Sequence, residues 1–121
     1  MQWQEWLFRL ARTRLAGCLI GGVFAHMSFV IPVDRLHETA TLLAFYHPKP
    51  SYPVHILIVP KRTRRGLEAL SPADADFMVD LFAAVQKLVQ DLGLERTGYR
   101  LICNGGVYKD VQQLHFHLIS E

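Results

Sequence analysis

The stretch Gln113-Leu114-His115-Phe116-His117 lies near the end of the 121-residue sequence and alternates polar and apolar side chains. Successive side chains of a β-strand point to opposite faces, so the alternation predicts a strand with Gln113, His115 and His117 on one face. Two imidazoles and an amide are more than a structural strand needs, because buried polar groups must find partners. An exposed sheet face without a function can carry the same pattern, so this strand alone leaves both interpretations open.

A second histidine lies in Val54-His55-Ile56-Leu57-Ile58-Val59-Pro60, a nearly continuous apolar run that is typical of a buried strand. If the two strands are neighbours, His55 can meet His115 and His117 across them. Three converging imidazoles favour a phosphate site or a metal site. Zinc would need three neutral imidazoles plus a water, or a fourth protein ligand. No carboxylate or thiol obviously completes the set, so we favour phosphate and expect no metal.

A glycine turn, Asn104-Gly105-Gly106, leads into the histidine strand. Glycine lets backbone N–H groups come close to an anion, which agrees with a phosphate site. Ordinary hairpins use the same residues, so the turn adds weight only through its position between two predicted strands, 99–103 and 112–119.

The clearest element is a helix from Pro72 to Leu92, followed by a turn at Gly93. Ser71 is the expected N-cap, Pro72 fits the first turn, and Asp74 completes a capping-box pattern. Its apolar side chains recur at helical spacing and predict packing on a broad sheet face. The stripe comprises Phe77, Leu81, Ala84, Val85, Leu88 and Leu92.

The first half of the chain predicts one amphipathic helix, at about 2–25, and three strands, at 30–36, 41–46 and 54–59. The proline-rich segment 47–53 is predicted to be a loop. The resulting order is helix, strands, long helix, two strands, which favours an α+β fold with a mainly antiparallel sheet. At this length we expect a single domain over residues 1–121, with its core over about 26–120.

The net charge of +2 does not imply a polyanion-binding surface. The densest basic run, Lys61-Arg62-Thr63-Arg64-Arg65, follows a predicted strand and fits a solvated turn better than a nucleic-acid patch. The two cysteines, Cys18 and Cys103, show no metal or redox spacing. We therefore expect free thiols, a reducing cytoplasmic location, and no nucleic-acid partner.

The segment from Leu15 to Val33 has no charged residue and is long enough to span a bilayer. Glycines, His26 and Pro32 interrupt it, which argues against a spanning helix. Leu15-Ala16-Gly17-Cys18 is similar to a lipoprotein cleavage box, but arginines stand where a signal peptide needs its apolar core. Membrane attachment through this segment is the less favoured interpretation.

Three segments together resemble the histidine triad (HIT) superfamily, nearest its Hint-like branch: Pro53–Lys61, Gly98–Asn104 and Gln113–His117. The resemblance covers about residues 31–119. It implies a HIT-like fold with an antiparallel sheet of about five strands and one long helix. It also implies a homodimer that binds a small nucleotide and catalyses hydrolysis or transfer at the α-phosphorus, without a cofactor.

Residue by residue, the resemblance makes His115 the nucleophile, with His117 and His55 as its catalytic companions. Nucleotide or phosphate contacts would come from eight further positions: Phe45, His47, Leu57, Asn104, Gly105, Gly106, Asp110 and Gln113. Among these, Phe45 and Leu57 would form walls beside the base.

Two positions depart from the family pattern: Gln113 replaces the first triad histidine, and His47 replaces an acid that binds ribose hydroxyls. In relatives the first histidine acts largely through its backbone carbonyl, which any residue has, so the resemblance implies that nucleophilic chemistry survives. The leading function is therefore cleavage of a nucleoside phosphoramidate or related nucleotide. The alternative is a module that binds a nucleotide or phosphate with little catalysis.

Overall fold

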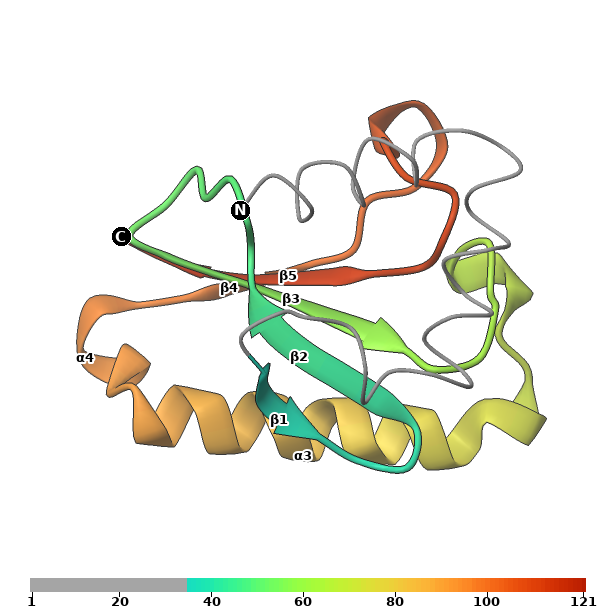
Figure 1. The fold of residues 1–121 in the computed structure, drawn as a ribbon, viewed down its shortest axis with the longest axis horizontal. Helices are drawn as coiled ribbons and strands as arrows, with labels where there is room; N and C mark the ends of the chain where they lie inside the picture. The colour runs from blue at the N-terminus through green and yellow to red at the C-terminus, as the bar shows by residue number, and fades with distance from the viewer. Residues whose placement is uncertain (1–34) are drawn as a thin grey trace.

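A computed structural model describes residues 35–121, which form a five-stranded antiparallel sheet with one long helix along one face (Figure 1). The strands lie in the order β1-β2-β3-β5-β4. Their bounds are β1 (Arg35–Glu38), β2 (Leu42–Tyr46), β3 (Val54–Pro60), β4 (Arg100–Ile102) and β5 (Phe116–Ser120). The helices are α3 (Ala75–Asp91) and the short α4 (Leu94–Thr97). The predicted α+β fold is confirmed, whereas the predicted helix at 2–25, the uncharged segment and Cys18 lie outside the described residues.

The core lies between α3 and the sheet. Apolar side chains of β2, β3 and β5 meet the buried stripe of α3, because burial of both apolar faces stabilises their packing. The predicted stripe is confirmed except at Leu92, which is 37% exposed, while Val89 is buried at 5%. Leu92 follows the last residue of α3, and Gly93 then adopts a left-handed φ of 64°. The helical periodicity therefore stops before Leu92 can turn towards the sheet.

The start of the long helix agrees with its predicted capping box. The Ser71 hydroxyl accepts a hydrogen bond from the Ala73 N–H, and the Asp74 carboxylate accepts one from the Ser71 N–H. The first three residues, Pro72–Asp74, form a 3₁₀ turn, and the α-helix proper begins at Ala75. A tightened first turn of this kind is common at helix ends.

The bounds of all five strands differ from the prediction, by a single residue at β2 and β3 and by more at the final strand. The final strand was predicted over residues 112–119, but β5 begins only at Phe116, which pairs with Ile58. Two residues beyond Ile58, β3 ends at Pro60, which has no N–H to continue the ladder. The strand predicted at 99–103 is shortened to β4 because Gly98, at φ 85°, ends the preceding turn. The strand predicted to end at residue 36 continues in β1 to Glu38, paired with Leu43.

Within residues 35–121, no helix combines the length and apolar character needed to cross a membrane.

Candidate functional site

Strand pairing places the histidines on the sheet face opposite α3. Directly opposed residues of antiparallel strands point to the same face. Ile56 pairs with Leu118, and both belong to the core against α3. By alternation, His55 and His117 must point the other way. His47 joins them, since its N–H donates to the His55 carbonyl at 2.8 Å and so continues the pairing of β2 with β3. We call this side of the sheet the histidine face.

Four imidazoles gather on the histidine face. The ring centroids of His55 and His117 are 5.1 Å apart, and those of His115 and His117 are 5.0 Å apart. The ring of His47 lies 4.4 Å from that of His55 and 6.2 Å from that of His117. The structure thus brings together the three histidines that the sequence predicts, and His47 makes a fourth member of the cluster.

Hydrogen bonds set the direction in which His117 can donate. The Ser51 N–H donates to Nδ1 of His55 at 3.0 Å, so in a neutral ring the proton of His55 lies on Nε2. That nitrogen is 2.9 Å from Nδ1 of His117, to which it donates. The proton of a neutral His117 must then lie on its own Nε2. His117 therefore presents an N–H donor at the far side of its ring.

His115 has the opposite arrangement. Its Nδ1 lies 2.9 Å from the backbone carbonyl of Gln113, which can only accept a hydrogen bond. Nδ1 of His115 consequently carries the proton, and Nε2 of the neutral ring keeps its lone pair. A ring in this state can act as a nucleophile through Nε2.

The surroundings keep these rings uncharged. Burial lowers the pKa of His117 to about 4, and the neighbouring rings of His115, His55 and His47 add to the effect. Burial, followed by His55 and His115, lowers the pKa of His47 to about 4 as well. Burial also lowers the pKa of His55. For His115, burial lowers the pKa, while the hydrogen bond to the Gln113 carbonyl and the nearby Asp110 carboxylate oppose the shift.

Gln113 acts on His115 through its backbone rather than its side chain. Its amide is buried at 2% exposure and bonds to the loop after β3, with Arg64 N–H donating to Oε1 at 3.2 Å and Nε2 donating to the Arg62 carbonyl at 3.1 Å. The prediction that Gln113 and His115 lie on the final strand is wrong, because both precede β5, which begins at Phe116.

The segment between β4 and β5 carries four further candidates. Gly106 has a φ of 57° and begins a 3₁₀ turn, Gly106–Tyr108, so a glycine is favoured there by its left-handed backbone. Gly105 is extended and exposed, and Asn104 is partly buried just after β4. Asp110 lies close enough to His115 to raise its pKa. Phosphate contacts by these residues stay a prediction.

Phe45 and Leu57, which are predicted to contact the nucleotide base, are aligned with His117 across neighbouring strands. Phe45 pairs with Leu57, and Leu57 pairs with His117, so all three share the histidine face. Phe45 and Leu57 are each 1% exposed. Their contact with a nucleotide base stays a prediction.

Cys103 lies apart from the imidazoles, since it packs against the core on the α3 side of the sheet. Burial raises the pKa of its thiol, which keeps it protonated. Over residues 35–121, no three or more His, Cys, Asp or Glu side chains are grouped as metal ligands would be.

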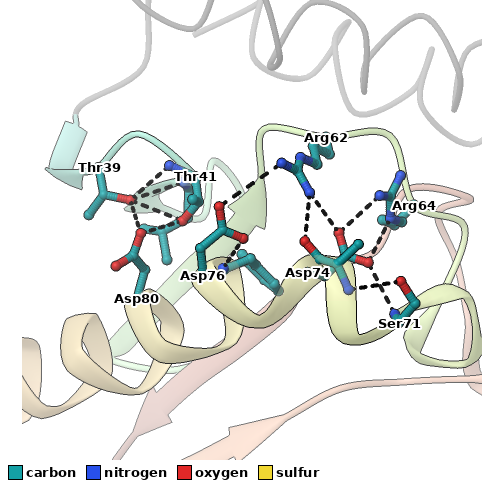
Figure 2. Close-up of polar contacts among 11 residues, drawn as sticks. Thr39, Thr41, Arg62, Arg64, Ser71, Asp74, Asp76 and Asp80 are labelled. Carbon is teal, nitrogen blue, oxygen red and sulfur yellow. Dashed lines mark hydrogen bonds and ion pairs between the residues drawn. The ribbon is translucent and has the colours of Figure 1, made fainter.

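The basic run after β3 has partners within the protein. Lys61 forms an ion pair with Glu38 at 2.7 Å, and Arg65 donates to the side chain of Gln112 at 3.2 Å. Arg62 and Arg64 both reach the carboxylate of Asp74, as Figure 2 shows. The run thus fastens a loop to its neighbours.

Two residues of the proline-rich loop belong to the site although the sequence did not single them out. Ser51 supplies the N–H that fixes the His55 ring, and Tyr52 packs edge-on against that ring at 5.5 Å. A backbone donor leaves no trace in side-chain pattern. The position of Ser51, four residues before His55, was the only available signal.

Comparisons with known proteins agree with this geometry. The HIT domain model matches residues 28–121. An uncharacterized HIT-like protein of Helicobacter pylori is 30% identical over 92 residues, which cover 74% of this chain and 86% of that protein. A HIT family hydrolase of Clostridium thermocellum is similar in structure, with a TM-score of 0.73, 30% identity, and coverage of 86% of this chain and 90% of the other. A histidine triad nucleotide-binding protein of Candida albicans gives a TM-score of 0.69 at 28% identity, over 84% of this chain and 72% of the other. Together with the fold and the clustered imidazoles, the match over residues 28–121 shows that this chain belongs to the HIT domain family.

Proposed function

We propose that the protein is a nucleotide hydrolase or nucleotidyl transferase that uses His115 to attack the α-phosphorus of a nucleoside phosphoramidate or a related nucleotide. One observation carries the proposal: Nδ1–H of His115 is held by the Gln113 carbonyl, which leaves the lone pair on Nε2. The neighbouring N–H of His117 supports it, because a donor beside the nucleophile can stabilise a phosphate oxygen.

In the proposed reaction, Nε2 of His115 forms a bond to phosphorus while the bond from phosphorus to the amine breaks. The leaving amine takes a proton from water, and the nucleotide stays on the imidazole. Water then attacks phosphorus, the bond to His115 breaks, and a nucleoside monophosphate is released. An alcohol or amine in place of water gives transfer instead of hydrolysis.

Other residues of the site hold the substrate in this proposal. His117 donates to a phosphate oxygen, and His55 keeps the His117 ring in the donating tautomer. The Asn104-Gly105-Gly106 segment and Asp110 line the phosphate end, while Phe45 and Leu57 lie towards the base. His47, a neutral ring beside His55, takes the place nearest the sugar.

We also propose that two copies of the chain pair through the outer side of α3 and the edge strand β4. Val79 and Phe82 on α3 are 69% and 65% exposed, and Tyr99 beside β4 is 48% exposed. Phe82 and Tyr99 line a groove of about 670 Å³. Large apolar side chains exposed beside a groove, as Phe82 and Tyr99 are, are typical of an interaction site.

The His115→Ala variant tests the proposed function. With an adenosine 5′-phosphoramidate of a simple amine as substrate, we expect kcat/KM to fall by more than about a thousandfold, because no other group can replace the nucleophile. Alkaline denaturation of the native enzyme during turnover should trap the nucleotide on His115, because the bond from phosphorus to imidazole is stable to alkali and labile to acid. Both results are measured by chromatography and mass spectrometry.

The matched control is His37→Ala. His37 pairs with Ala44, whose side chain faces α3, so this histidine lies away from the histidine face. Its replacement should leave turnover unchanged. Equal turnover by His115→Ala and the native protein would reject the nucleophile. Tight binding of AMP by calorimetry without any turnover would indicate a binding module instead.

A further inference from the structure

The Gln113 side chain ties the segment before β5 to the loop after β3. Two side-chain hydrogen bonds make this link: Arg64 N–H donates to the Gln113 Oε1 at 3.2 Å, and Gln113 Nε2–H donates to the Arg62 carbonyl at 3.1 Å. A backbone bond from Leu114 N–H to the Arg64 carbonyl at 2.7 Å lies beside them. At 2% exposure, the amide has no access to bulk water, and loss of these partners would leave it unsatisfied. The link is therefore a fixed part of the fold.

The loop that receives Gln113 is itself anchored. Arg64 donates to both oxygens of the Asp74 carboxylate, through Nε at 3.2 Å and a terminal nitrogen at 2.9 Å. Arg62 donates to the Ala73 carbonyl at 3.1 Å and to Asp74 at 3.3 Å. Figure 2 shows both arginines converging on Asp74 at the start of the long helix. Charge-assisted, two-point contacts of this kind restrict the orientation of a guanidinium group.

The position of residue 113 matters because its carbonyl lies outside the sheet ladder. β5 begins at Phe116, so no interstrand hydrogen bonds of the sheet align the Gln113 peptide. The bonds to the loop take over that task. They fix the carbonyl that accepts from Nδ1 of His115 at 2.9 Å, and this contact decides which nitrogen of the ring has its lone pair.

We propose that Gln113 is a positioning residue, whose side-chain bonds to the backbone of Arg62 and Arg64 hold the carbonyl that keeps His115 in the Nδ1–H tautomer. Asp74 supports the same contact one step further away, through the two arginines. The catalytic consequence rests on the proposed function, whereas the effect on the ring does not. The glutamine at this place is thus a structural anchor for the nucleophile.

The Gln113→Met variant tests this role, because methionine fills a similar volume but makes neither side-chain bond. The matched control is Gln112→Met, since Gln112 is the adjacent glutamine and its amide accepts only from the exposed guanidinium of Arg65. Long-range proton–nitrogen NMR correlations report the tautomer of His115 without any substrate. We expect a single Nδ1–H tautomer in the native protein and in Gln112→Met, and a mixture of both tautomers in Gln113→Met.

An unchanged His115 tautomer in folded Gln113→Met would overturn the proposal. If that variant does not fold, Gln113→Glu provides the same comparison. Glutamate keeps the acceptor for Arg64 N–H but loses the donor to the Arg62 carbonyl, so its tautomer mixture should lie between those of the native protein and Gln113→Met. A native tautomer in Gln113→Glu would then count against the role.

Kinetics separate this inference from the proposed function. In Gln113→Met we expect kcat to fall by up to roughly a hundredfold with little change in KM, because the nucleophile is misaligned while the pocket remains. Gln113→Glu should recover part of the loss. A shifted tautomer in a protein that never turns over phosphoramidates would support the positioning role and reject the proposed function. Turnover of phosphoramidates by the native protein, with an unshifted His115 tautomer in Gln113→Met, would support the proposed function and reject the positioning role.

Discussion

At the scale of single residues, the hydrogen bonds that Ser51 and His55 donate on the histidine face run in one direction, towards His117. The Ser51 N–H, His55 and His117 form a relay in which each group donates to the next, and the relay ends in an N–H donor. His115 has its proton on the other nitrogen. One ring therefore presents a donor and its neighbour a lone pair, which is the combination needed to hold a phosphate oxygen and attack phosphorus.

The same uncharged rings should make the protein sensitive to acid. Burial lowers the pKa of His47 and His117 from 6.5 to about 4 in the folded chain. Between these values the unfolded chain binds protons that the folded chain does not, so the free energy of unfolding decreases as the pH falls. We expect a loss on the order of a few kcal/mol from about pH 7 to about pH 4, measured by urea denaturation.

The His117→Asn variant should show a smaller loss of stability over the same pH range, since one of the shifted groups is gone. His37→Asn, on the other face of the sheet, should behave like the native protein. If His117→Asn and the native protein lose equal stability, His117 is not a source of the acid sensitivity.

Much of this face could be predicted from the sequence. The sequence predicted that His115 and His117 lie together, although His115 precedes β5, and an apolar run placed His55 on a neighbouring strand. The relay partner Ser51 could not be found, because a backbone N–H has no sequence signature. The side-chain bonds of Gln113 were also hidden, since they depend on where the loop at 62–64 lies in space.

At the scale of elements, the start of the long helix carries more than a cap. Figure 2 shows Asp74 receiving Ser71 N–H from its own turn and both arginines from the loop after β3. The Arg64 hydrogen bond is the main cause that lowers the pKa of Asp74, so the carboxylate is charged at neutral pH. Helix and loop are thereby joined at one side chain.

Asp74→Asn should lower the free energy of unfolding by roughly 3 kcal/mol, because a buried charge is removed from two arginines that point at it. The control is Asp76→Asn, because the Asp76 side chain is 56% exposed and its contact with Arg62 is long, at 4.0 Å. That change should cost less than about 1 kcal/mol. Chemical denaturation measures both. Equal effects of the two substitutions would show that the Asp74 cluster has no special role in stability.

The elements themselves were largely predictable, but their ends were not. Ser71, Pro72 and Asp74 marked the beginning of the helix by local rules that act within one turn. The start of β5 depends on where its neighbour stops, because Pro60 ends the ladder of β3. The first residue of β5 therefore depends on a strand far away in sequence, so no local sequence pattern predicts it.

At the scale of the whole molecule, one face of the sheet carries α3 and the other carries the imidazoles. Figure 1 shows the long helix running along its side of the sheet, with β4 at one edge. The outer side of α3 and the neighbouring Tyr99 expose apolar groups around a single groove. The proposed dimer would cover this surface.

Phe82→Glu should convert the proposed dimer to monomers, because a carboxylate in an apolar contact loses its hydration. Sedimentation equilibrium measures the molecular mass in solution. Lys87→Gln is the control, since Lys87 is an exposed residue on the same helix that pairs with Asp91 and does not line the groove. A monomeric native protein, or a Phe82→Glu variant that stays dimeric, would contradict this assembly.

The strand order has a consequence for how the chain is made. β5 lies between β3 and β4, although it follows both in sequence. A chain emerging from the ribosome therefore exposes two open strand edges before the strand that joins them has been synthesised, and such edges invite pairing with other chains. His115 and His117 arrive with that joining strand. The nascent protein thus gains these two imidazoles in the same event that covers the facing edges of β3 and β4.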